Sequence, residues 1–313
     1  MATHSRSLAI ALTCCACTAW AGSSIDVLRK ALDSRRTTAA SLIQVQTAFE
    51  GAERIVTKVE YDGKGRSRRT MLQPLRMQGH VYIDDGKSVT TILPDSQTIK
   101  TIASRPPSND FRLELIGKNY QLSSVKGERI AGRTTIKIFC RPKAREMPSR
   151  RITVDQETYI PLRVASIYQG KESVLLDTLS FETPKEMPSS LFTAPTSGRT
   201  KVVKIPSPVR VKDEVAAAEY VPFQPWVPQN IPLGFAVESL EVLLAGKGSV
   251  LALRLTDGFN MATIYEWDAN FESHFPHSSL VASRNLRFSL LGDLPDAIRG
   301  KLKEYLCKGA MAL

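Results

Sequence analysis

The chain has few of the residues on which metal binding and covalent chemistry depend. Its 313 residues include five cysteines and four histidines. Three of the cysteines lie within the first 17 residues, which leaves Cys140 and Cys307 in the rest of the chain. The close histidine pair, His274 and His277, encloses a proline, which disfavours the helical spacing of a two-histidine metal site. We therefore expect neither a bound metal nor a cofactor.

Cys140 and Cys307 leave two alternatives open. In an oxidising compartment they would form one disulfide. Their wide separation in the sequence favours two isolated thiols, each packed in its own surroundings.

Motifs typical of catalytic sites are also missing. No serine elbow or cysteine nucleophile motif accompanies His80. Asp84-Asp85-Gly86 is typical of a hairpin turn rather than of an acid–base pair. Gly63-Lys64-Gly65 and Gly246-Lys247-Gly248 are typical of hairpin tips rather than of phosphate-binding loops. We predict that the protein is not an enzyme, with an uncharacterised envelope enzyme as the minor alternative.

The apolar run at the start of the chain is short. Leu8–Ala19 spans 12 residues, whereas a helix that crosses a membrane needs about 20. Arg6 precedes this run and small residues follow it, as in a secretory signal peptide. We predict that residues 1–23 are a cleaved signal peptide and that the mature protein is periplasmic or otherwise extracytoplasmic. A cysteine of this leader carrying a lipid anchor is the alternative.

Acidic residues are scarce in the first two thirds of the chain. Up to Lys212 there are 34 basic and 19 acidic residues, a net charge of +15, whereas from Asp213 onward there are 8 basic and 12 acidic residues, a net charge of −4. This asymmetry predicts two units with different partners. On an exported protein, a basic surface suits anionic lipid head groups or acidic envelope polymers better than nucleic acid. We expect peripheral contact with anionic membrane and no nucleic-acid partner.

Short alternating strands are what the chain contains in abundance. Residues 119–168 hold three period-two runs separated by turns, which is typical of an antiparallel meander. Residues 40–49 and 54–61 alternate in the same way. A short amphipathic helix is expected from Ser24, and residues 110–116 are expected to form a short helix or lid over the sheet. These patterns predict one long, curved antiparallel sheet with helices.

The composition changes after residue 195. Prolines and basic residues punctuate residues 196–225, which we interpret as an inter-domain linker stiffened by proline. Residues 226–313 contain three or four alternating strands and then a helix that starts near Leu294. This pattern predicts a small α+β domain.

Short motifs in both units resemble those of one known family. In the first unit they are Asn119-Tyr120, Ala131-Gly132-Arg133, Arg141-Pro142-Lys143, Arg151-Ile152-Thr153-Val154-Asp155, Pro161-Leu162-Arg163, and Pro188 with Leu191-Phe192. In the second unit they are Pro232-Leu233-Gly234-Phe235, Thr256-Asp257-Gly258 and Leu291-Gly292-Asp293-Leu294-Pro295. In their order and spacing, these motifs resemble the RseB/MucB family, periplasmic regulators of the envelope-stress sigma factor.

The resemblance implies an architecture and a function. The fold would be α+β, with a half-open antiparallel β-barrel and covering helices, similar to the LolA/LolB lipoprotein carriers, over residues 24–195. A small α+β partner-binding domain over residues 226–313 would follow the linker. The first domain would bind an acyl chain, lipid or lipoprotein, and the second the extracytoplasmic part of a single-span anti-sigma factor. A LolA-type carrier of lipid or lipoproteins is the alternative.

Two sets of residues are candidates for ligand contact. Strand parity places the cavity lining at Ile43, Val45, Ile55, Val59, Val81, Ile83, Val125, Ile136, Ile138, Val164 and Leu175. These side chains would equally fill an ordinary core. A head-group or surface basic cluster would consist of Arg141, Lys143, Arg145, Arg150 and Arg151. These residues flank one turn and would equally make a solubilising loop.

Overall fold

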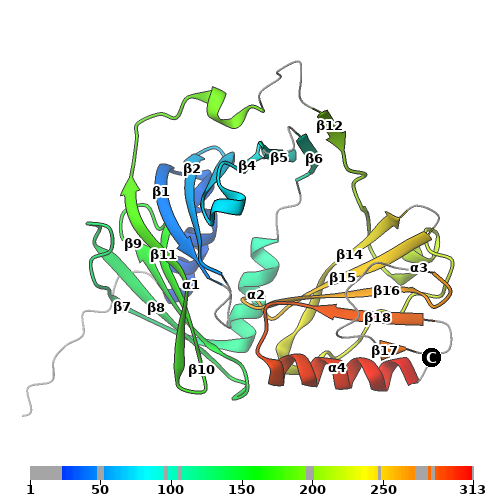
Figure 1. Cartoon of the computed structure of the whole chain (residues 1–313). Coiled ribbons are helices and arrows are strands. Elements are labelled where there is room, and N and C mark those ends of the chain that lie inside the picture. Colours follow the sequence, from blue (N-terminus) through cyan, green and yellow to red (C-terminus); the bar gives the residue numbers. More distant parts are fainter. Residues whose placement is uncertain are drawn as a thin grey trace, which may run out of the picture.

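A computed structural model of the chain shows two units lying side by side (Figure 1). The structure describes residues 23–47, 53–94, 98–104, 108–194, 201–245, 248–271, 281–282 and 286–311. The predicted signal peptide, up to residue 22, and the His274 and His277 pair lie outside the described residues.

The first unit is built on a large sheet. Its strands are β1 (Ala39–Gln46), β2 (Ile55–Asp62), β3 (Ser67–Gln73), β4 (Val81–Asp84), β5 (Ser88–Leu93), β6 (Thr98–Ala103), β7 (Tyr120–Lys126), β8 (Thr135–Pro142), β9 (Ser149–Asp155), β10 (Pro161–Tyr168) and β11 (Lys171–Glu182). Its helical elements are α1 (Ser24–Asp33), η1 (Ser34–Arg36), η2 (Leu75–Met77), α2 (Asn109–Asn119) and η3 (Ser189–Phe192).

The strand order is β12-β6-β5-β4-β3-β2-β1-β11-β10-β9-β8-β7. Neighbouring strands are antiparallel, except that β12 (Lys201–Lys204) runs parallel to β6. The sheet is open, with β12 and β7 at its edges. The predicted α+β class and the large antiparallel sheet are therefore confirmed, and the sheet is not a closed barrel.

One row of paired residues defines the inner face of this sheet. Gln46 pairs with Leu176, Leu176 with Val164, Val164 with Ile152, and Ile152 with Ile138. Directly paired residues lie on the same face, and successive residues of a strand alternate between faces. Helices α1 and α2 pack on the part of this face that carries Ile152 and Ile138.

Each of the two helices begins at a serine cap and buries an apolar side. The Ser23 hydroxyl accepts the Asp26 amide at 3.3 Å, and the Ser108 hydroxyl accepts the Phe111 amide at 3.4 Å. The buried residues are Val27, Leu28 and Ala31 on α1, and Leu113, Leu115 and Ile116 on α2. The predicted helix from Ser24 is confirmed, and α2 is longer than the predicted lid.

The described part of the predicted linker contributes to both sheets. It contains β12, β13 (Val209–Val211) and α3 (Glu214–Ala218). β12 extends the large sheet, whereas β13 pairs with β14 of the second unit. The segment that we interpret as a linker stiffened by proline therefore carries short strands that pair with the edges of both sheets.

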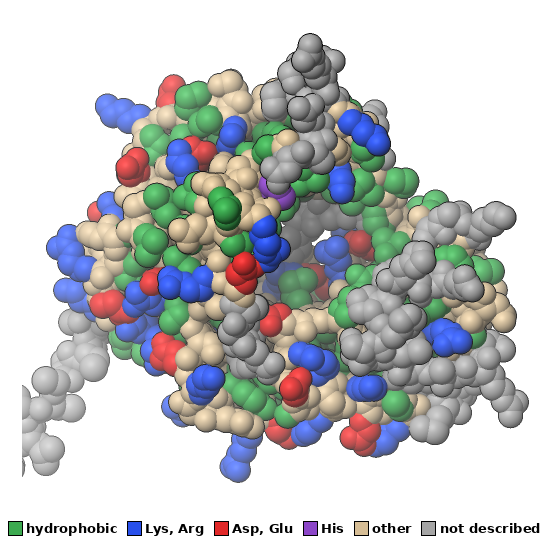
Figure 2. Space-filling model, in the orientation of Figure 1, with side chains coloured by type: hydrophobic (Ala, Val, Ile, Leu, Met, Phe, Trp, Pro, Cys, Tyr) green, Lys and Arg blue, Asp and Glu red, His purple; other side chains and the backbone are tan. Residues whose placement is uncertain are grey.

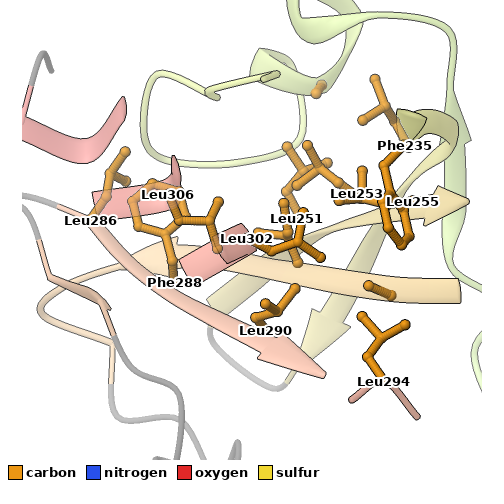
Figure 3. Packing of buried hydrophobic residues seen from close by; sticks show 14 of the residues in the cluster. Phe235, Leu251, Leu253, Leu255, Leu286, Phe288, Leu290, Leu294, Leu302 and Leu306 are labelled. Atoms are coloured by element: carbon orange, nitrogen blue, oxygen red, sulfur yellow. The ribbon is translucent and has the colours of Figure 1, made fainter. Parts of the chain in front are cut away.

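The second unit is a sheet covered by a long helix. Its elements are η4 (Pro232–Gly234), β14 (Ala236–Ala245), β15 (Gly248–Thr256), β16 (Met261–Asp268), β17 (Val281–Ala282), β18 (Leu286–Leu291) and α4 (Asp296–Met311). The strand order is β13-β14-β15-β16-β18-β17, so our estimate of three or four strands was too low. Figure 3 shows Leu302 and Leu306 of α4 lying near Phe288 and Leu251 in a core of fully buried side chains.

Candidate functional site

An apolar cluster lies between the inner face of the large sheet and its two helices. Its buried members are Val27, Leu28, Ala31, Leu113, Ile116, Tyr120, Ile136, Ile138, Cys140, Ile152 and Val154. A second cluster continues along the inner face at β1 and β2, where Ala40, Leu42, Val59 and Tyr61 pack with Ile130, Ile160 and Leu162. An apolar ligand that entered the first cluster would have to separate α2 from the strands.

The structure divides the predicted lining residues between the two faces. The register places Ile55, Val59, Ile136, Ile138 and Val164 on the inner face. It places Ile43, Val45, Val81, Ile83 and Val125 on the outer face, and Leu175 falls at the bulge in the β10–β11 pairing. The eleven residues are therefore not brought together.

Strand phase is the reason for this division. A one-residue change of register moves every side chain of a strand to the opposite face. On the outer face, η3 packs Phe192 against Val81 and Ile83 and makes them part of a separate core. The inner-face residues that sequence reasoning missed include Leu42, Val154 and Leu162. The signal that could have found them is the pairing of each strand with its neighbour.

The predicted basic cluster is also divided. Arg141 and Arg145 are exposed. Lys143 donates from Nζ to the carbonyl oxygens of Gly117 at 3.3 Å and of Lys118 at 2.6 Å, at the C-terminal end of α2.

The two adjacent arginines of the cluster lie on opposite faces of β9. Arg151 pairs with Glu172 at 2.8 Å. Arg150 is only 7% exposed, which corrects the prediction that it lies in a surface cluster. Alternation along β9 turns it inward.

Arg150 belongs to a buried polar network that joins the two units. Its Nη2 donates to the Asn260 side-chain oxygen. Asp257, which is 1% exposed, accepts the Tyr120 hydroxyl at 2.7 Å and the Asn260 side-chain amide at 2.7 Å. Asn119 at the end of α2 donates to the carbonyl oxygens of Asp257 at 2.9 Å and Gly234 at 2.8 Å. We call these five residues, Asn119, Tyr120, Arg150, Asp257 and Asn260, the joint.

The joint places ionisable groups in a poorly solvated setting. Burial, together with the nearby Asp257 carboxylate, raises the pKa of the Tyr120 phenol well above its usual range. Burial lowers the pKa of Arg150, while Tyr120, Asp257 and Asp293 oppose that effect. Burial also raises the pKa of the Cys140 thiol to about 12. Cys140 and Cys307 are both free thiols, so the disulfide alternative is not the one seen.

The turn between β15 and β16 inserts into the first unit. Phe259 packs on the inner-face cluster and meets the Tyr120 ring edge-on, at 4.9 Å between ring centroids. Gly258 has φ +110, and a Cβ atom there would lie 3.0 Å from the Ile116 backbone nitrogen. Only glycine therefore suits this close approach.

Ion pairs flank the joint on both sides. Arg112 of α2 donates to both carboxylate oxygens of Glu238, at 2.6 and 3.1 Å. Lys301 of α4 pairs with Glu146 at 2.6 Å, and Met147 packs into the core of the second unit. Helix α2 thus touches both the inner-face cluster and the second unit.

A groove runs along the open edge of β14. Two pockets of about 560 and 550 Å³ share Val227, Gln229 and Val237. Within the described residues, β13 pairs only with Leu240–Val242 and leaves Ala236–Ser239 without a strand neighbour on that side. One end of this β14 groove reaches α3 and the other reaches α2.

Two kinds of feature are absent from the described residues. No group of three or more His, Cys, Asp or Glu side chains there is arranged to hold a metal ion. None of the helices in that part of the chain is both long and apolar enough to cross a membrane.

A family profile matches part of the first unit. Residues 59–188 match the family profile described as the MucB/RseB N-terminal domain. No curated protein sequence matches the chain. The resemblance to the RseB/MucB family that the motifs indicated is confirmed.

Solved structures share the fold. The complex structure of Pseudomonas aeruginosa MucA/MucB is 14% identical, covers 90% of this chain and 97% of that chain, and gives a TM-score of 0.60. A crystal structure of MucB is 15% identical, with 90% and 96% coverage and a TM-score of 0.55. MucB in complex with MucA(peri) is 14% identical, with 90% and 97% coverage and a TM-score of 0.59. At this identity, the likeness establishes the fold over most of the chain.

Proposed function

We propose that the protein is an exported, non-enzymatic sensor of the RseB/MucB type. Its first unit binds an acyl chain, lipid or lipoprotein on the inner face, and its second unit binds the extracytoplasmic part of a single-span anti-sigma factor. The signal peptide predicted for residues 1–23 would direct it to the periplasm. Binding of a ligand to the first unit would then change the affinity of the second unit for the anti-sigma factor.

One observation carries this proposal: α2 takes part in both surfaces. Leu113 and Ile116 cover the apolar inner face, while Arg112 and Asn119 bond to the second unit. Each methylene of an acyl chain buried on the inner face would contribute about 0.8 kcal/mol. A chain of modest length would therefore supply enough free energy to displace α2 and alter the joint.

The β14 groove supports the second half of the proposal. An extended segment of a partner can add to an open strand edge through main-chain hydrogen bonds. The MucB structures that share this fold include complexes with MucA and MucA(peri). A partner lying in this groove would touch α2 at Leu115 and Lys118.

The carrier alternative rests on the predicted likeness to LolA and LolB, with the large sheet as a half-open barrel. A carrier would release its ligand to an acceptor and needs no protein partner on the second unit. The two functions therefore differ in what the second unit does.

Binding to a partner tests the proposal. The mature chain, residues 24–313, would be titrated against the extracytoplasmic part of a single-span anti-sigma protein from the same gene neighbourhood, by calorimetry. We expect micromolar or tighter binding that weakens when dodecyl phosphate is added. Val237→Lys in the β14 groove should abolish binding, whereas Lys171→Glu on the first unit should not. Absence of binding, together with ligand transfer to an acceptor protein, would favour the carrier.

A further inference from the structure

One arginine on the inner face has a shielded donor that no described residue accepts. Arg69 of β3 pairs directly with Val59 of β2 and Tyr82 of β4, so it shares the face of the apolar cluster. Its Nε atom is shielded from solvent and has no hydrogen-bond partner among the residues that the structure describes. Among the described residues it makes no ion pair. A shielded guanidinium donor that is left unpaired is costly, and such groups usually have a partner.

A second arginine approaches the same place. Arg35 of η1 lies over the Tyr61 ring, 5.4 Å from its centroid. Burial and then the positive charge of Arg35 lower the pKa of Arg69, while Tyr61 and Tyr82 oppose that effect. Among the described residues, no carboxylate is one of the groups that act on Arg69. Two cations brought together without an anion repel each other.

Other arginines of the first unit are compensated. Arg133 bonds to Asp155 and Glu157, and Arg163 bonds to Asp177 and Glu128. Arg150 of the joint has Asp257 and Asp293 near enough to support its charge. Arg69 therefore differs from these three arginines, because no acidic residue is among the described groups that act on it.

We propose that Arg69 and Arg35 bind the oxyanion head group, phosphate or carboxylate, of an amphiphile whose hydrocarbon lies on the inner face. Planar guanidinium groups suit such oxyanions because they donate two parallel hydrogen bonds. Leu42, Val59 and the Tyr61 ring continue the same face toward the strands under α1 and α2. This deepens the proposed function, on whose acyl ligand it rests, and moves the head group away from the Arg141 to Arg151 turn.

Calorimetry with three probes tests the site on the mature full chain. The probes are dodecyl phosphate, the uncharged dodecyl maltoside and inorganic phosphate, with the detergents below their micelle concentrations. We expect Arg69→Gln to weaken dodecyl phosphate binding at least tenfold, and Arg35→Gln several-fold, without changing dodecyl maltoside binding. Arg69→Lys should fall between, because it keeps the charge but loses the paired donors. Inorganic phosphate that competes with dodecyl phosphate identifies a free anion as a ligand, and failure to compete identifies the lipid head group.

Matched controls separate the site from general charge and from folding. Arg68→Gln changes the neighbouring residue, which lies on the outer face of β3 and bonds to the Leu191 carbonyl. Arg36→Gln changes the exposed neighbour of Arg35. Both should bind dodecyl phosphate like the parent, and thermal unfolding would verify that every variant is folded.

Two outcomes would overturn the head-group site. If the Arg69→Gln variant binds dodecyl phosphate as tightly as the parent chain, Arg69 does not bind the anion. The same holds if its affinity for both detergents falls equally. The acyl-binding half of the proposed function would survive either result. If the parent chain binds neither detergent, that half fails as well, and the head-group site fails with it.

Discussion

The two sheets bury one face in different ways. In the second unit, α4 lies along the sheet, and Ile298, Leu302 and Leu306 are at most 1% exposed. In the first unit, α1 and α2 cover β7–β10, while the inner face of β1–β3 carries Thr57 and Arg69, each with a shielded polar atom that no described residue bonds. Polar side chains with unmet hydrogen bonds weaken a core. A face closed by its own helix is therefore structural, and a face that keeps such groups is suited to a ligand.

The largest expected effect concerns the closed core of the second unit. Phe288→Ala should lower the free energy of unfolding by about 3–5 kcal/mol, because it removes a large buried ring from a packed interior. Phe181→Ala, on the partly exposed inner face, should cost about half as much. Urea denaturation of both variants measures the difference. Equal losses would remove the distinction between the two sheets.

The joint should give the next largest effect. Asp257→Ala removes the acceptor of the Tyr120 hydroxyl, of the Asn260 side chain and of two backbone amides. We expect a loss of about 2–4 kcal/mol, since buried donors are left unpaired. The thermal transition should also separate into two, one for each unit. Asp268→Ala, beside an exposed turn, is the control; a similar change there would show that the joint is not special.

A carboxylate inside the second core makes stability depend on pH. Glu266 is fully buried and accepts the Trp226 amide at 3.0 and 3.2 Å. Burial raises the pKa of Glu266 to about 8, above its ordinary value of 4.5. The folded state then holds a proton that the unfolded state has lost, so stability should fall as pH rises from about 5 to about 8.

Removing that carboxylate isolates its contribution. For the parent chain, the free energy of unfolding should decrease by about 1–3 kcal/mol over this pH range. Glu266→Gln keeps an acceptor for Trp226 and has no charge to bury, so its stability should be flatter across this range. Denaturation at several pH values compares the two, and parallel curves would contradict the assignment.

The smallest effect concerns the inner face itself. The Thr57 hydroxyl is buried and has no hydrogen-bond partner within the described part of the chain. Thr57→Val should raise stability by about 0.5–1 kcal/mol, since it replaces an unpaired polar atom with a methyl group of similar size. Thr178→Val should not, because Thr178 accepts from Gln44 at 3.2 Å. Stabilisation of both variants alike would mean that the inner face tolerates apolar change anywhere.

Much of the fold could be predicted from the sequence, because alternation and turn residues report on single strands. The meander, the helix from Ser24 and the lid over the sheet were all visible locally. Which face a strand shows depends on its neighbours. Ile136 and Ile138 lie inside and Val81 and Ile83 outside, although all four alternate in the same way.

The candidate site was harder to predict because its residues meet only in three dimensions. Arg150 and Arg151 look alike in sequence, yet one enters the joint and the other pairs with Glu172. Arg69 lies in a run of basic residues that reads as solvated. The residues that pair with it on β2 and β4 determine its surroundings, and no pattern within β3 itself indicates which residues they are.

The strand β12 limits how the two units can move. It pairs with β6, and only four residues, 205–208, separate it from β13 of the second sheet. Pro206 and Pro208 stiffen that crossing, and the Ile205 amide donates to the Thr101 carbonyl at 3.0 Å. In Figure 1, β12 lies at the top of the space between the units and α2 lies lower, beside the second unit, and Figure 2 shows a hollow between the units. The crossing therefore connects the two sheets at a second place, so breaking the joint would leave the units held together at β12.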